Sequence, residues 1–163
     1  MSTSQLSTQS AVDRRSAGAE LRGLISKFAP AHEGLIGTMR RSLRKRLPTA
    51  HEVVYEYSDC LVISYSPNER GYEGVLAIRG SANGVELYFN SGKALPDPAK
   101  LLRGSGKLAR FIHTEGASTL KRAAIVRLID EAIARNHVPF ASTGRGPIVI
   151  RSTSAKKRPR RPA

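Results

Sequence analysis

Four short apolar segments within residues 51–90, separated by turn-forming residues, constrain the fold of this chain more than any other feature. In the first segment, Val53 and Tyr55 alternate with Glu52, which is the two-residue period of a half-buried strand. The other segments are rich in the β-branched and aromatic residues that favour strands, and they cover residues 60–65, 72–78 and 85–89. The sequence therefore predicts a four-stranded antiparallel meander.

The dipeptide Asn83-Gly84 predicts the register of the last hairpin in this meander. It favours a two-residue type I′ turn, in which both central residues need positive φ. Such a turn would place Ile78 opposite Phe89. The apolar residues of both strands then fall on one face, so the turn chemistry and the hydrophobic pattern agree.

Apolar residues at helical spacing predict helices on either side of this meander. These segments cover residues 16–28, 30–47 and 120–136. Two more short apolar segments, residues 108–113 and 148–150, predict a fifth strand and a last short strand. Together the elements predict a two-layer α+β fold, in which an antiparallel sheet of about five strands packs against helices.

The length of 163 residues accommodates one domain with tails. Residues 1–15 and 152–163 lack apolar periodicity and are expected to be disordered, which leaves residues 16–151 as the domain. The single Cys60 excludes an internal disulfide framework, and its apolar strand favours a buried, inert thiol. Since no apolar run reaches the roughly 18 residues of a membrane helix and no secretory signal begins the chain, we expect a cytoplasmic protein without a membrane partner.

The net charge of +14 is concentrated in two segments that contain no acid. Residues 40–46 carry five cations, which helical spacing groups on one side of the second predicted helix, and residues 151–163 carry six. Such surfaces bind polyanions by releasing counterions, or they only keep a protein soluble. The cations expected to contact a polyanion are Arg40, Arg41, Arg44, Lys45, Lys156, Lys157, Arg158, Arg160 and Arg161.

A series of short motifs is spread over residues 18–151. They are Leu47-Pro48 and residues 52–55, 84–89, 102–107, 109–112, 143–146 and 148–151. Together these motifs resemble the YdhG-like family of small bacterial domains of unknown function. The resemblance implies a compact α+β fold, and because one branch of the family is described as a frataxin-like iron chaperone, it also implies an iron-carrying role as an alternative.

The histidines place limits on such a metal site. His32 and Glu33 are adjacent in a predicted helix, where neighbouring side chains do not face each other. Iron needs oxygen or imidazole ligands that converge on one point. A site would therefore depend on a tertiary contact such as that of His113 with Glu115, and without one the histidines are solvated surface residues.

Two glycine-containing loops invite a phosphate-binding interpretation. Residues 104–107 lack the earlier glycine and the following Ser or Thr of a Walker A motif, so they predict only a loop that leads into a strand. Thr143, Gly144, Arg145 and Gly146 form either an anion-binding nest of backbone N–H groups or a plain turn that brings the chain close to the sheet.

No residue pattern predicts a reaction. As a nucleophile, Cys60 would need His51 as an adjacent base, and nothing in their spacing requires this. Neither basic segment has aromatic residues between its cations, which argues that these segments are not specialised for binding single-stranded nucleic acid. The sequence favours a non-enzymatic binding or accessory module that contacts an anionic partner, either nucleic acid or an acidic protein. The alternatives are the iron chaperone and a small-molecule sensor that uses the sheet face around Tyr65 and Tyr88.

Overall fold

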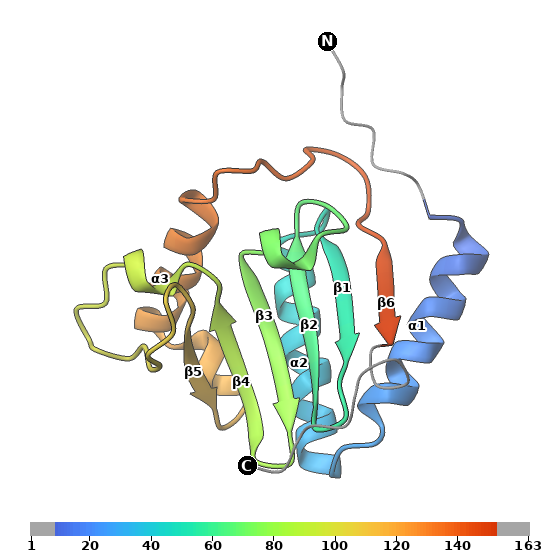
Figure 1. Ribbon diagram of the computed structural model, residues 1–163, viewed down its shortest axis with the longest axis horizontal. Helices are drawn as coiled ribbons and strands as arrows, with labels where there is room; N and C mark the ends of the chain where they lie inside the picture. The colour runs from blue at the N-terminus through green and yellow to red at the C-terminus, as the bar shows by residue number, and fades with distance from the viewer. Residues whose placement is uncertain (1–8, 153–163) are drawn as a thin grey trace.

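The computed structural model describes residues 9–152 and has an α+β fold (Figure 1). The helices are α1 (Ala11–Ile25), α2 (Pro30–Arg46) and α3 (Ala123–Ala134). The strands are β1 (His51–Glu56), β2 (Cys60–Ser66), β3 (Leu76–Ser81), β4 (Gly84–Phe89), β5 (Arg110–Thr114) and β6 (Ile148–Ser152). Short 3₁₀ turns lie at Gly71–Glu73, Gly92–Ala94 and Ala117–Lys121.

The described strands form one six-stranded sheet in the order β5-β4-β3-β2-β1-β6. The meander predicted at residues 51–90 is confirmed and forms β1 to β4, but its third strand begins at Leu76 rather than at residue 72, because Gly71–Glu73 is a 3₁₀ turn. Neighbouring strands are antiparallel except that β6 pairs in parallel with β1. The prediction of an antiparallel sheet of about five strands is therefore wrong, although the α+β class is confirmed. A three-residue apolar segment such as residues 148–150 contains no information about the direction in which it will pair.

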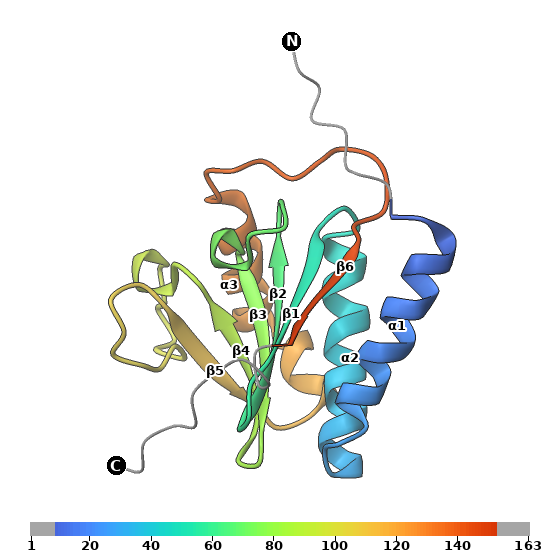
Figure 2. The same ribbon diagram turned by 45° about the vertical axis from the view of Figure 1, so that its right-hand side comes forward.

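The three α-helices of the described chain lie on one face of the sheet (Figures 1 and 2). A row of buried apolar residues crosses the strands on that face, formed by Val54, Ile63, Ile78, Leu87 and Ile112. Buried residues of all three helices belong to the same cluster, so the helices and the sheet share one core. Because such burial is the main favourable term in folding, this core fixes the two-layer arrangement. The opposite face, called the helix-free face below, carries no α-helix from residues 9–152.

The β3–β4 hairpin differs in register from the prediction. Ile78 lies opposite Leu87, two residues before its predicted partner. Ser81 pairs with Gly84, so the turn residues are Ala82 and Asn83 rather than Asn83 and Gly84. The φ of Gly84 is positive (131°), and the Asn83 N–H donates to the hydroxyl of Ser81 (3.2 Å). This local hydrogen bond competes with the predicted turn type. Because the partner changes by two residues, the same side chains still face the core.

α1 begins at Ala11 rather than at residue 16. The Ser10 hydroxyl accepts a hydrogen bond from the Asp13 N–H (3.0 Å) and caps the helix. The Gln9 side chain exchanges two hydrogen bonds with the Ile148 backbone, of 2.9 and 3.1 Å. These polar contacts attach the start of α1 to β6, and apolar periodicity could not predict them.

The remaining helix predictions are confirmed. The predicted segment 30–47 contains α2, and the predicted segment 120–136 contains α3, which follows a 3₁₀ turn. Residues 1–8 and 153–163, which contain most of the predicted tails, lie outside the described residues. Within residues 9–152, none of the helices combines the length and the apolar character needed to cross a membrane.

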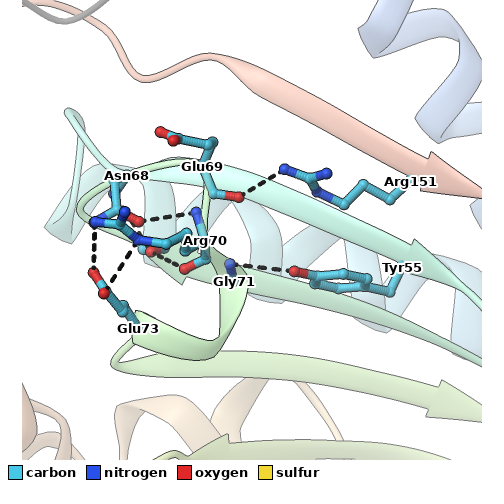
Figure 3. A network of polar contacts seen from close by, with 8 residues as sticks. Tyr55, Asn68, Glu69, Arg70, Gly71, Glu73 and Arg151 are labelled. Atoms are coloured by element: carbon cyan, nitrogen blue, oxygen red, sulfur yellow. Dashed lines mark hydrogen bonds and ion pairs between the residues drawn. The ribbon is translucent and has the colours of Figure 1, made fainter.

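The loop between β2 and β3 folds over part of the helix-free face, as Figure 3 shows. The Gly71 N–H donates to the Tyr55 hydroxyl (3.2 Å), and the Gly71 carbonyl accepts from the Ser64 hydroxyl (2.8 Å). The guanidinium of Arg151 donates to the Glu69 carbonyl (3.0 Å). The loop is thus attached to β1, β2 and β6, which form one side of the sheet.

The connection into β6 passes close to the segment that follows α2. The Gly146 N–H donates to the Pro48 carbonyl (3.0 Å), and a Cβ at Gly146 would collide with the carbonyl of Ala50. Only a residue without a side chain fits between these backbones.

We expect Gly146→Ala to lower the free energy of unfolding by about 1–3 kcal/mol or more, because the added methyl group must displace backbone. Urea denaturation measures the change. Gly116→Ala is the matched control: no atom lies within 4 Å of the added Cβ, so its effect should stay within about 0.5 kcal/mol. Equal effects of the two variants would contradict the close approach at Gly146.

Candidate anion-binding groove between α1 and α2

A groove of about 440 Å³ lies between α1 and α2. α1 ends at Ile25, and Pro30 occupies the start of α2, so a short turn joins the two helices as a hairpin. Gly34 and Gly37 line the groove and have no side chains to fill it. The charged residues of the lining are Arg22, Glu33, Arg40, Arg41 and Arg44. The groove is therefore cationic.

Two of these arginines bind a buried carboxylate from the sheet. Arg40 donates to Glu52 through Nε (2.8 Å) and Nη2 (3.0 Å), and Nε of Arg44 lies 3.4 Å from the same carboxylate. The Tyr65 hydroxyl donates a further hydrogen bond to Glu52 (2.9 Å). Because the Glu52 side chain is only 3% exposed, its charge depends on these partners for compensation.

The position of Glu52 corrects the predicted orientation of β1. Its alternation with Val53 predicts that Glu52 faces solvent, but Glu52 lies on the helix-facing side of β1 together with Val54. The prediction is wrong because α2 supplies paired cations, and a charge can be buried where it is paired. The pattern of a strand does not show which charges a neighbouring helix will supply.

Arg22 and Arg41 are the cations of the groove that do not contact Glu52. Both side chains are exposed. Arg41 donates to the Thr38 hydroxyl within its own helix (3.1 Å). Arg22 comes from α1 and Arg41 from α2, so each helix contributes a guanidinium group to one site. Guanidinium groups bind phosphate and carboxylate oxygens in a bidentate manner, and this groove can hold either kind of anion.

The structure separates the cations that were predicted on α2. Arg40, Arg41 and Arg44 line the groove, whereas Lys45 is exposed outside its lining. Arg46 pairs with Asp130 of α3 (2.7 Å). The predicted cations of residues 156–161 lie outside the described residues.

Sequence reasoning missed Arg22. Its position near the end of α1, directly before the short turn into α2, was the available signal. In a helical hairpin the last turn of one helix lies beside the first turns of the next, so Arg22 is placed next to α2. Arg22 has no cluster of cations near it in the sequence, so the charge pattern did not indicate that it belongs to a cationic site.

The other predicted sites lie elsewhere. Thr143, Gly144 and Arg145 are exposed, and the Gly146 N–H is already hydrogen-bonded to Pro48, as in the plain turn considered above. Within residues 9–152 no three or more His, Cys, Asp or Glu side chains are grouped so that they could hold a metal ion. The weak metal candidates His113 and Glu115 thus gain no further ligand there, and iron binding stays a prediction.

Cys60 and His51 lie at opposite ends of the paired strands β1 and β2, since Cys60 begins β2 and His51 pairs with Ser66 at its end. Cys60 is half-buried rather than buried as predicted, and this partial burial raises the pKa of its thiol, which disfavours the nucleophilic thiolate. Tyr65 and Tyr88 point to opposite faces of the sheet, because Tyr65 is fully buried in the core and Tyr88 is half-buried on the helix-free face. The predicted sensor surface around both residues is therefore not a single surface.

Comparison with known proteins finds no matching family, no curated protein of similar sequence and no solved structure that matches this chain. Membership of the YdhG-like family accordingly stays a prediction.

We expect Glu52→Gln to lower the free energy of unfolding by about 3–5 kcal/mol, because it leaves Arg40 and Arg44 without a buried counter-charge. Chemical denaturation measures the loss. Glu86→Gln makes the same change in the more exposed pair with Arg79, where we expect at most about 1 kcal/mol. Comparable losses in both variants would contradict the structural role of Glu52.

Tyr65 predicts a loss of stability at alkaline pH. Burial, and after it the Glu52 carboxylate, hold the pKa of Tyr65 well above its usual range. The unfolded chain releases the Tyr65 proton near pH 10, whereas the folded chain keeps it. The free energy of unfolding is therefore unaffected by this group below pH 10 and falls above it by about 1.4 kcal/mol per pH unit. In denaturation curves at increasing pH, Tyr65→Phe should lose stability less steeply than the wild type. Tyr72→Phe, at a residue that is 78% exposed, should follow the wild type.

Proposed function

We propose that this protein is a non-enzymatic binding or accessory module that holds an anionic partner, nucleic acid or an acidic protein, in the groove between α1 and α2. The observation that supports the proposal is the gathering of Arg22, Arg40, Arg41 and Arg44 around one groove. Glu52 compensates part of this charge and fixes two of the guanidinium groups. Arg22 and Arg41 are then available to the partner.

The buried carboxylate also gives the groove a rigid base. Arg40 is held by two hydrogen bonds to Glu52, so less side-chain entropy is lost when an anion binds beside it. A flexible lysine surface of the same charge would lack this preorganisation. Binding through several phosphate contacts releases counterions and should weaken steeply with salt. The basic residues 156–161 are proposed to add further contacts of this nonspecific kind.

The test measures fluorescence anisotropy of labelled duplex DNA and of an acidic peptide at about 50 and 200 mM salt. The Arg22→Glu/Arg41→Glu variant should lose at least about tenfold in affinity, since two attractive contacts become repulsive. The Lys121→Glu/Arg127→Glu variant of the α3 region carries the same charge change at exposed residues outside the groove lining and should bind nearly as the wild type does.

A chain that ends at Arg151 separates the groove from the tail. If this chain binds and the groove variant does not, the groove is the main site. Equal losses in the groove variant and the α3 variant would show that binding follows net charge alone, and the proposal would then be wrong. Preference for the peptide over DNA would assign the partner as an acidic protein.

A further inference from the structure

Two aromatic rings lie side by side on the helix-free face of the sheet. Tyr88 of β4 and Phe111 of β5 are directly opposite each other in the antiparallel ladder. Their ring centroids are 5.1 Å apart and the ring planes differ by 27°, which is a stacked arrangement. Both residues are half-buried, so part of each ring is accessible to solvent. Because no α-helix covers these apolar rings, a flat ligand can stack on them.

Arg103 extends this aromatic pair at the edge of the sheet. It forms an antiparallel bridge with Phe111, with backbone hydrogen bonds of 2.8 and 2.9 Å in the two directions. Directly bridged residues project to the same face, so Tyr88, Phe111 and Arg103 form one row across three backbone segments. Arg103 is exposed and makes no side-chain hydrogen bond or ion pair with the described residues that would occupy its guanidinium group.

Gly104 places the loop of Arg103 against the aromatic pair. Its φ is +112°, a conformation that residues with a side chain rarely adopt. A Cβ at this position would lie 3.3 Å from the Phe111 ring. The backbone at Gly104 therefore packs against one edge of the Phe111 ring.

Cations lie near the aromatic pair. The segment that carries Arg103 and Phe111, residues 98–114, contains four cations and no acid, although Arg110 alternates with Phe111 in β5 and donates to the carbonyls of Gly106 (2.6 Å) and Ala109 (2.7 Å). On the other side, Arg79 of β3 lies on the same face as Tyr88 and forms an ion pair with Glu86 (3.1 Å). Burial first, and then the Glu86 carboxylate, raise the pKa of Tyr88, so its phenol is neutral at ordinary pH. The surface thus combines neutral rings with an excess of positive charge at the edge of the sheet.

We propose that this face, defined by Tyr88, Phe111, Arg79 and Arg103, binds single-stranded nucleic acid. Bases stack on the rings, and the phosphates next to them contact Arg103 and the basic loop. A duplex cannot make these stacking contacts, because its bases are stacked on one another and cannot lie on the rings. An apolar ligand would leave the cations without a partner, and a second copy of the chain would bring the same positive charges together. The site is on the face opposite the α1–α2 groove and does not rest on the groove's proposed function.

The test uses a short single-stranded oligonucleotide that contains 2-aminopurine, and the full-length protein. The wild type should bind it and quench the 2-aminopurine by stacking, while a duplex of the same sequence should bind more weakly at this face. Tyr88→Leu and Phe111→Leu should each reduce the affinity by roughly 5- to 150-fold, the range of one base–aromatic stack, and the quenching should disappear. Circular dichroism checks that both variants stay folded.

Arg103→Glu gives a second variant that keeps the rings and alters only an exposed side chain. It should weaken binding and reduce the salt dependence, whereas Arg127→Glu on α3 should do neither. The Arg22→Glu/Arg41→Glu groove variant should keep the quenching, which distinguishes failure of this face from failure of the groove. Unchanged binding in all three face variants, or no binding at about 50 mM salt, overturns the proposal. So does a dimer in sedimentation experiments that Arg103→Glu dissociates, because the face would then be an interface between copies.

Discussion

A carboxylate buried between a strand and a helix determines how the two layers of this protein meet. Glu52 receives two hydrogen bonds from Arg40, one from Tyr65 and an ion pair from Arg44. Apolar contacts between a helix and a sheet are non-directional and tolerate small slides. A bidentate arginine–carboxylate pair is directional, so it fixes the position of α2 along β1 where the apolar core alone would not.

This interaction also explains why the two faces of the sheet differ in chemistry. On the helix-covered face, Arg40 and Arg44 point inward and pair with Glu52. The other two arginines, Arg22 and Arg41, line the α1–α2 groove. On the helix-free face of residues 9–152 no Asp, Glu, Lys or Arg is buried, and the row there is formed by half-buried aromatic rings with arginines at its edges. The same positive composition therefore produces a charged groove on one side and a mixed aromatic and basic surface on the other.

Local patterns predicted the elements, and long-range partners decided what the sequence could not show. Pro30 and the apolar spacing after it define α2, and the alternation within residues 51–90 defines the meander. The direction of β6 depends on β1, far away in the chain, and the burial of Glu52 depends on Arg40, on the preceding helix. The hairpin at Gly84 is intermediate: its existence was predictable, but its register was not, and the Asn83 N–H donates to the Ser81 hydroxyl in the turn that forms. The groove was predictable in its α2 half, since three of its arginines are spaced four residues or fewer apart, and not in its α1 half.

The parallel strand β6 has a consequence for assembly. It lies at the edge of the sheet beside β1, and α1 packs against it. Until residues 148–152 pair with β1, the outer backbone groups of β1 have no strand partner, although the meander can already be formed. An unpaired edge of this kind is a template on which another chain can add a strand, and exchange of β6 between two copies would satisfy it equally well. Pairing within one chain is favoured because β6 is tethered to the same chain as β1, which gives it a high effective concentration. The Gln9–Ile148 hydrogen bonds then attach it to the start of α1. The parallel strand thus closes the edge of β1 to other chains and leaves β6, against which α1 packs, as the edge of the sheet.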